Sequence, residues 1–317
     1  MTPAAPPVPP PERVADRRHI TLDAVGVTLS ARLARPAHVP PRATVVALHG
    51  AGMSSAYFDG PAHPETSLLT LGAELGFAVV AVDRPGYGAS AGQLPYGQGV
   101  VEQAATLAEA LHGLADHGET GAGIFLVAHS FGSKPALRMA ADGTVPGLLG
   151  LDVSGCGAEY VVPPTVPVTR AGSWKLNWGP LRLYPPGTFQ AGLGVVAPVP
   201  PHELDAAARW PDVFAALAGR VRVPVRFTFA EHEAWWRRDS SALARLRGRL
   251  GAAPRVLIDH QPDAGHNISL GWTARAYHLR ALGFAEERLR SPAAGREATD
   301  MTGKRCEAAA GRRQGGA

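Results

Sequence analysis

The chain alternates predominantly apolar runs with stretches of helical spacing. The apolar runs, which predict strands buried on both faces, cover residues 44–48, 77–82, 124–128, 148–153, 223–229 and 255–258. Helical spacing predicts helices over residues 67–75, ended by Gly76, and over residues 98–117 and 135–141. This alternation is typical of an α/β protein with a mostly parallel central sheet that is covered by helices on both faces.

Two segments depart from that pattern. Residues 19–33 alternate between apolar and polar and predict a strand pair that turns near Gly26. Between residues 156 and 221 the alternation is lost, and aromatic residues are scattered among proline clusters. We interpret this segment as a lid over the strand ends; the alternative is a peripheral decoration that does not contact substrate. The expected divisions are a disordered Pro-rich leader over 1–17, a core over 18–157 and 221–288, a lid insertion over 158–220, and a disordered basic tail over 289–317.

Composition narrows the class of protein. The chain has 317 residues, of which 45% are hydrophobic and 18% charged, which suits one large globular domain. We expect no membrane span, because no run of about 18 apolar residues is present. Residues 1–11 do not read as a secretory signal, and two cysteines, Cys156 and Cys306, make no disulfide framework, so a cytoplasmic location is expected. The net charge of +4 lies partly in the C-terminal residues; we expect no nucleic-acid partner, and binding through the basic tail is the last alternative.

A serine stands where the apolar run 124–128 ends. Ala128, Ser130 and Gly132 follow the pattern small-x-Ser-x-Gly, which lets a strand turn sharply into a helix while the serine hydroxyl stays exposed in a strained conformation. A plain loop serine would also fit these five residues. The position directly after a buried strand favours a nucleophile.

Four motifs together carry a resemblance to a known family. They are residues 48–52 (Leu-His-Gly-Ala-Gly), 83–90 (Asp-Arg-Pro-Gly-Tyr-Gly-Ala-Ser), 128–132 (Ala-His-Ser-Phe-Gly), and the pair Gly265 and His266. In this order along residues 18–285, the chain resembles the α/β-hydrolase superfamily. The resemblance implies the α/β-hydrolase fold with a lid insertion and a catalytic triad that begins at Ser130.

A serine nucleophile needs a base, and a histidine pKa near the working pH suits that role. His266 is the predicted base; it follows the last strand through an expected loop over residues 259–265, and Gly265 leaves room for a tight approach. The rival histidines are interpreted as structural. They are His260 at the strand end, His129 with its side chain expected to point away from the serine, and His49 packed under its loop.

The third member of a triad is a carboxylate that orients the imidazole. The superfamily's order of serine, acid and histidine points to the loop after residues 223–229, and the position three residues after Ala230 is Glu233. Glu231 is the fallback acid, and Asp152 is a second possible origin. Two solvated loop glutamates remain the structural alternative.

The resemblance also implies an oxyanion hole made by the backbone N–H groups of Ala51 and Phe131. Asp83 is expected to cap a turn instead of touching substrate. No metal site and no cofactor are expected, since the histidines lack paired spacing and no Gly-rich phosphate loop opens a long helix.

These observations predict a serine hydrolase that cleaves an ester or thioester, less often an amide, through an acyl-enzyme on Ser130. The partner is a small-molecule substrate in an apolar, aromatic pocket. One alternative is an acyltransferase or another non-hydrolytic member of the superfamily, since water and other acceptors use the same intermediate. A second is a non-catalytic binding protein on the same fold.

Overall fold

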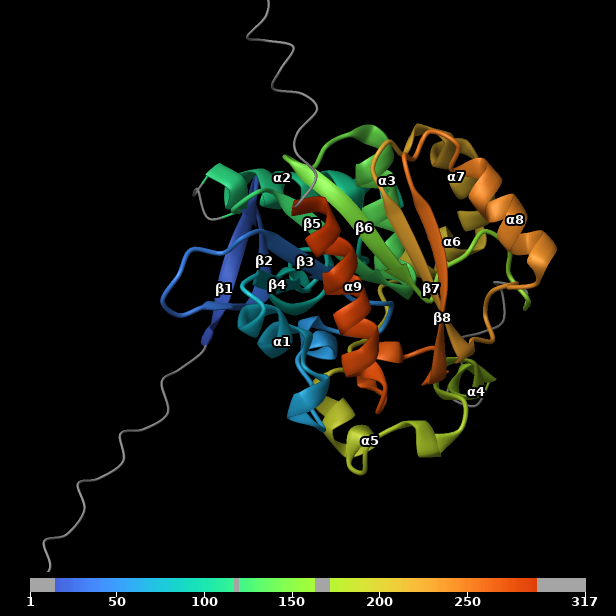
Figure 1. Ribbon diagram of the computed structural model, residues 1–317, viewed down its shortest axis with the longest axis horizontal. Helices are drawn as coiled ribbons and strands as arrows, with labels where there is room; N and C mark the ends of the chain where they lie inside the picture. The colour runs from blue at the N-terminus through green and yellow to red at the C-terminus, as the bar shows by residue number, and fades with distance from the viewer. Residues whose placement is uncertain (1–14, 117–119, 163–171, 290–317) are drawn as a thin grey trace, which may run out of the picture.

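The fold is built on one eight-stranded sheet, seen in the computed structural model of the chain (Figure 1). The structure describes residues 15–116, 120–162 and 172–289. The strands are β1 (Ala15–Ala24), β2 (Val27–Pro36), β3 (Thr44–Leu48), β4 (Ala78–Val82), β5 (Ile124–His129), β6 (Leu148–Ser154), β7 (Val225–His232) and β8 (Val256–Gly265). Their order across the sheet is β1-β2-β4-β3-β5-β6-β7-β8.

Six of the eight strands run parallel, and the β1–β2 hairpin joins them antiparallel at one edge. The central strands are buried at every position, which explains their unbroken apolar sequences. Leu48 at the end of β3 pairs with Val82 of β4 and with Ala128 of β5, so these strands end at one level. The predicted mostly parallel sheet is confirmed, and the loops that follow its strands meet along one rim.

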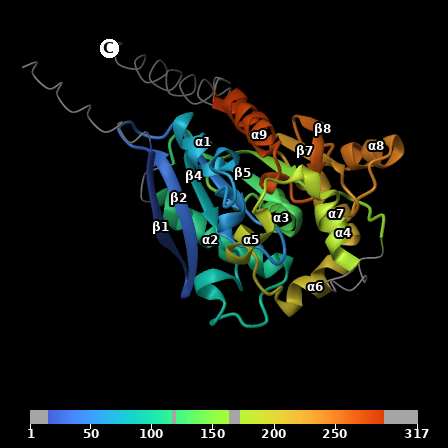
Figure 2. The same cartoon turned by 90° about the horizontal axis from the view of Figure 1, so that it is seen from below.

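Helices cover both faces of the sheet (Figures 1 and 2). Helices α1 (Leu68–Glu74) and α9 (Ala274–Leu289) pack on one face, where α9 contacts β6 and α1 contacts β4. Helices α2 (Val100–Asp116) and α3 (Ser133–Asp142) pack together on the opposite face, and the core on that side also takes in residues of α8 (Ser240–Arg249). Each face has its own apolar core. The core that contains α3 also includes Ala128 and Phe131, which lie on either side of Ser130 in the chain.

The long connection between β6 and β7, here called the insert (residues 155–224), forms helices and turns over its described residues. Its helices are α4 (Gly172–Trp178), α5 (Thr188–Ala191), α6 (Pro201–Ala208) and α7 (Trp210–Leu217). Helices α4 and α5 lie at the lower end of the sheet in Figure 1. Backbone contacts tie the insert to the loop after β3, since Ala197 N–H donates to Gly52 O at 2.9 Å and Met53 bridges to Val196. The lid boundaries at residues 158 and 220 stay a prediction.

Two predicted boundaries are wrong. Strand β1 begins at Ala15, inside the predicted leader, because residues 15–17 pair with residues 34–36 of β2; residues 1–14 lie outside the described residues. Strand β8 runs on through residues 259–265, where a loop was expected. Its pairing with β7 continues past a bulge to Gly265, although the sequence there is polar and holds Pro262. At the C-terminus Leu289 ends α9, and the rest of the predicted tail lies outside the described residues.

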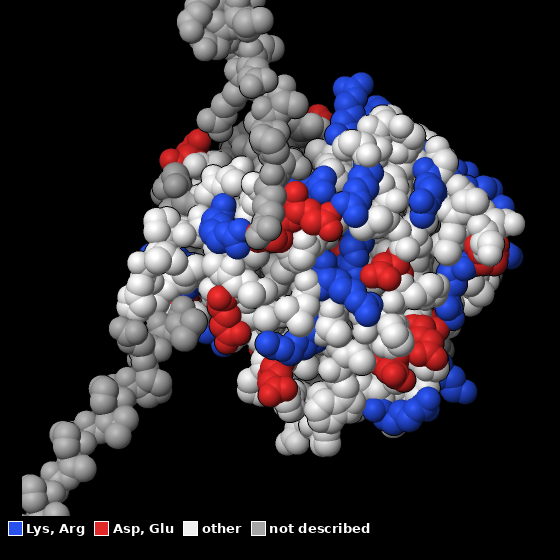
Figure 3. Space-filling view, in the orientation of Figure 1, with Lys and Arg blue, Asp and Glu red and all other residues white. Residues whose placement is uncertain are grey.

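The surface carries both signs of charge. On the face shown in Figure 3, basic and acidic side chains are interspersed. The surface ion pairs of the described chain include Arg42 with Glu286. Within the described ranges, no helix is both long enough and apolar enough to cross a membrane.

Candidate active site

Ser130 sits in a sharp turn between β5 and α3. Its φ of 51° places a non-glycine residue in the left-handed region, which costs free energy and persists only where the surroundings enforce it. Gly132 helps to hold Ser130 in this conformation. A Cβ added to it would lie 2.5 Å from the carbonyl oxygens of both Leu48 and His49, so only glycine lets the turn pack against the end of β3.

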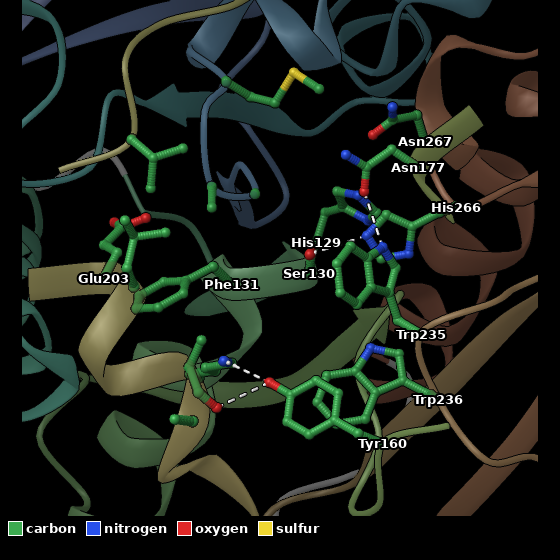
Figure 4. A pocket seen from close by; sticks show the side chains of 18 of the residues that line it. His129, Ser130, Phe131, Tyr160, Asn177, Glu203, Trp235, Trp236, His266 and Asn267 are labelled. Carbon is green, nitrogen blue, oxygen red and sulfur yellow. Dashed lines mark hydrogen bonds between the residues drawn. The ribbon is translucent and has the colours of Figure 1, made fainter. Parts of the chain in front are cut away.

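His266 lies between Ser130 and a carboxylate, and Figure 4 shows its contact with Ser130. The Ser130 hydroxyl lies 3.0 Å from His266 Nε2, and His266 Nδ1 lies 2.8 Å from Glu233 Oε2. Because a carboxylate only accepts, Nδ1 carries the hydrogen and Nε2 is left free to accept from the serine. The second Glu233 oxygen accepts from Trp235 N–H at 2.9 Å, which fixes the carboxyl plane. Both His266 and Glu233 are buried, so the hydrogen bond between them is shielded from water.

Of the three candidate acids, the structure places Glu233 against His266. The other two have different partners. A turn closed by Glu233 N–H and Ala230 O at 3.1 Å carries Glu233 off the end of β7. Glu231 is exposed, and its carboxylate accepts from Asp263 N–H at 2.8 Å. Asp152 is buried within β6, where it pairs with Arg226 and accepts from the Tyr277 hydroxyl at 2.9 Å.

The rival histidines have other partners. His260 lies exposed on β8. His49 is buried beneath its loop, where Nδ1 donates to Gly50 O at 2.8 Å and Nε2 accepts from Arg84 N–H at 3.1 Å. Burial lowers the pKa of His49 well below its usual value, and the nearby Arg84 charge lowers it further. His49 is therefore held neutral in one tautomer.

The expected orientation of His129 is wrong. Its ring stacks on Tyr57 at 4.8 Å between centroids, lies 4.9 Å from the His266 ring, and lines the same cavity as Ser130. Its Nδ1 is 3.1 Å from Ser154 Oγ, so its hydrogen bond goes to β6. Side chains alternate between the two faces of a sheet only within a strand. His129 is the last residue of β5, where the turn begins, so alternation does not predict its direction. Burial lowers the pKa of His129 well below its usual value.

The two predicted oxyanion donors lie beside the serine. Ala51 and Phe131 both line the cavity onto which Ser130 opens. The loop that carries Ala51 backs directly onto the serine, since a Cβ added to Gly50 would lie 3.0 Å from Ser130 Cβ and 3.6 Å from Ser130 Oγ. The oxyanion role of the two backbone N–H groups stays a prediction.

A buried charge network holds the loop after β3 and was missed from the sequence. Arg84 pairs with Glu203 of α6 and donates from Nε to His49 O at 2.7 Å. The Glu203 carboxylate also accepts from the Tyr87 hydroxyl at 2.8 Å and from Gln103 Nε2 at 2.9 Å. Arg84 and Tyr87 belong to the motif at residues 83–90, in which only Asp83 was given a role, and nothing in the Pro-rich sequence around Glu203 marks a partner.

The site opens into a cavity of about 520 Å³. The core contributes Ser130, His266 and the loop after β3, and the loop after β7 adds Trp235 and Trp236. The insert supplies much of the remaining wall: Tyr160, Asn177, Val199, Glu203, Leu204, Asp205, Ala207 and Ala208. No group of three or more metal-ligating side chains gathers anywhere in the part of the chain that the structure describes.

Comparisons with known proteins show the family and the fold of the chain. A model of the family described as "Alpha/beta hydrolase family" matches residues 45–294. Among solved structures, a thermostable carboxyl esterase from Bacillus coagulans is similar with a TM-score of 0.64 at 16% identity, over 87% of this chain and 99% of that one. A peroxisomal alpha-beta-hydrolase from Saccharomyces cerevisiae has a TM-score of 0.58 at 14% identity, over 93% and 96%. The thioesterase domain from the curacin biosynthetic pathway has a TM-score of 0.56 at 14% identity, over 84% and 99%. No curated protein matches the sequence.

Proposed function

This chain belongs to the α/β-hydrolase family, and from that membership we propose that it is a serine hydrolase that cleaves an ester or thioester through an acyl-enzyme on Ser130. The observation that carries the proposal is the position of His266, which lies within hydrogen-bonding distance of both Ser130 Oγ and Glu233 Oε2. A neutral serine is a weak nucleophile, and this arrangement gives it a base that is itself oriented.

In the proposed reaction, His266 Nε2 takes the hydroxyl proton as Ser130 Oγ attacks the substrate carbonyl carbon. The backbone N–H groups of Ala51 and Phe131 stabilise the negative oxygen that develops, each contributing about 3 kcal/mol to the transition state. His266 then donates the proton to the leaving alcohol or thiol. A water deprotonated by His266 attacks the acyl-enzyme, and collapse of the second tetrahedral intermediate frees Ser130. Glu233 stabilises the imidazolium in both steps.

The insert is proposed to act as the lid of this site. Its described residues form one wall of the cavity, and the contacts between Gly52 and Ala197 hold it against the loop that carries Ala51. Apolar and aromatic side chains in this wall, including Leu204 and Tyr160, favour an apolar substrate portion.

The test is covalent labelling with a fluorophosphonate probe followed by mass spectrometry. The wild-type protein is expected to gain one probe adduct on the peptide that holds Ser130, and Ser130→Ala is expected to gain none. Ser133→Ala is the matched control, because Ser133 is a buried neighbouring serine whose hydroxyl donates to Ala128 O at 3.0 Å. A folded wild-type protein that takes up no probe, or labels equally without the Ser130 hydroxyl, would refute the proposal.

A further inference from the structure

Lys134 is a buried cation in the wall of the active-site cavity. It is the second residue of α3, only 3% of the residue's surface is exposed, and it lines the same cavity as Ser130. Its ammonium donates to the Tyr160 hydroxyl at 3.1 Å, and that hydroxyl donates onward to Ala207 O at 3.1 Å (Figure 4). An ammonium has three N–H donors, and Tyr160 is its single hydrogen-bond acceptor among the described residues.

Aromatic rings surround the remainder of the ammonium. Its nitrogen lies 4.7 Å from the centroid of the Phe131 ring, 5.6 Å from that of Trp210 and 5.9 Å from that of Tyr160. Such rings stabilise a cation but offer no strong hydrogen-bond acceptor. Burial lowers the pKa of Lys134 to about 8, against the influence of Cys156 and Glu203, which raise it, while Arg84 lowers it further.

No carboxylate of the described chain compensates this charge directly. Lys134 forms no ion pair with any described residue. Glu203 lines the same cavity, but both of its oxygens are occupied by Arg84, Tyr87 and Gln103. Asp205 also lines the cavity and is exposed. A buried cation with unused donors, on the wall that also holds the nucleophile, is suited to bind an anionic part of a ligand.

We propose that Lys134 is the carboxylate subsite of this hydrolase, and that its substrates are esters or thioesters that carry a free carboxylate elsewhere in the molecule. This inference rests on the proposed function. The ammonium lies over the ring of Phe131, and Lys134 and Ser130 line one cavity, so a single substrate could reach both groups. A carboxylate supplies acceptors for the two unused N–H groups and compensates the buried charge. Monoesters of small dicarboxylic acids have this chemistry.

The kinetic test compares pairs of esters in which a second carboxyl group is either free or itself esterified. Monoethyl and diethyl esters of succinate, glutarate and adipate place the carboxylate on the acyl side. A second pair places the carboxylate on the alcohol side. It compares γ-hydroxybutyrate whose hydroxyl is esterified with butyrate and the same molecule with its carboxylate methylated. In at least one series the wild-type protein is expected to prefer the acidic ester at least tenfold in kcat/KM. The preference is expected mainly in KM, because the contact is remote from the reacting atoms.

The decisive variant is Lys134→Met, which shortens the side chain by one atom and removes its charge. The ratio of kcat/KM for the acidic ester to that for the neutral ester is expected to fall at least tenfold. Lys134→Gln, which keeps a donor for Tyr160, covers the case in which Lys134→Met does not fold. Lys175→Met is the control, because Lys175 of α4 is exposed and does not line the cavity. A wild-type protein indifferent to charge in both series, or a ratio unchanged by either Lys134 variant, would overturn the proposal.

A binding measurement separates this inference from the proposed function. Calorimetry with Ser130→Ala and glutarate needs no turnover, and binding is expected to weaken at least tenfold when Lys134→Met is added. If Ser130 takes up no probe but this binding is seen, the hydrolase proposal fails and the subsite remains. If neutral esters are cleaved in a Ser130-dependent way but glutarate binding does not depend on Lys134, the subsite fails and the hydrolase proposal remains.

Discussion

At the scale of single residues, two glutamates two positions apart have different partners. Glu233 bonds to His266, whereas Glu231 bonds to a backbone N–H at the end of β8. Glu231 lies near the end of β7 and Glu233 directly after it, so their separation depends on the turn that Ala230 and Glu233 close.

Glu233→Gln is therefore expected to reduce kcat about 10³- to 10⁴-fold on a neutral ester, because an amide favours the wrong imidazole tautomer and no longer stabilises the imidazolium. Glu231→Gln keeps an oxygen that accepts from Asp263 N–H and is expected to stay within about threefold of the wild-type kcat. Steady-state kinetics of the two variants side by side check this expectation. Equal losses would reassign the acid.

Gly155, directly after β6, lies against His266. Its φ is +58°, and an added Cβ would lie 2.8 Å from Cε1 of His266 and 3.1 Å from its Nδ1. Gly155→Ala is expected to displace the imidazole and to reduce kcat/KM about 100-fold, since a shift on the order of 1 Å can cost that much.

Gly143→Ala is the matched control for that substitution. Gly143 ends α3 with a φ of +67° and has open space at the Cβ position. Both variants are expected to lose about 1 kcal/mol of folding free energy from the left-handed backbone, but only Gly155→Ala should lose turnover. Urea unfolding and ester kinetics on both variants separate strain from displacement. Similar activity in the two variants would show that the contact with His266 is unimportant.

At the scale of elements, α6 of the insert and the loop after β3 are joined by the Arg84 network. Glu203→Gln leaves the buried Arg84 without its counter-charge, and we expect a loss of about 3 kcal/mol in folding free energy. We also expect kcat to fall about tenfold, because Arg84 donates to His49 O and Tyr87 accepts from Gly52 N–H, on either side of Ala51. Denaturant unfolding and ester kinetics measure the two effects.

Glu159→Gln is the comparison for the element-scale prediction. Glu159 pairs with Arg245 on the surface, and exposed pairs contribute little to stability. Its melting temperature and kcat are expected to match those of the wild-type protein. A Glu203→Gln variant that is unchanged in kcat would show that the network stabilises the insert without positioning the loop.

Strands could be predicted from the sequence where burial alone determines which residues they contain. Strands β3 to β5 lie between other strands and under helices, so their sequences are unbroken apolar runs. The second half of β8 could not be predicted, because it lies at the sheet edge, where one strand alone supplies its partners and polar residues are tolerated. Lys134 also gave no signal, since a single lysine in a helix normally points to solvent, and only the fold surrounds it with aromatic rings.

At the scale of the whole molecule, buried neutral histidines link stability to pH. Burial lowers the pKa of His278 in α9 to about 3, and its Nδ1 has no hydrogen-bond partner. The pKa values of His49 and His129 are lowered as well. In the unfolded chain these groups titrate near pH 6.5. The unfolded state therefore binds more protons below that pH, and folding stability falls as the pH drops.

Replacing His278 by Phe removes one of these protons. Between pH 6.5 and pH 5, the free energy of unfolding of the wild-type protein is expected to fall more steeply than that of His278→Phe, by up to about 1.4 kcal/mol per pH unit. Urea unfolding at several pH values gives both slopes. Parallel slopes would mean that His278 becomes charged in the folded protein.

The ion pair between Arg84 and Glu203 is not accessible to solvent, because both side chains are fully buried. Dissolved ions weaken attractions between charges that they can approach, and they do not approach this pair. Turnover of an uncharged ester should therefore tolerate high ionic strength. Salt that weakens exposed ion pairs would leave α6 in its place beside the cavity.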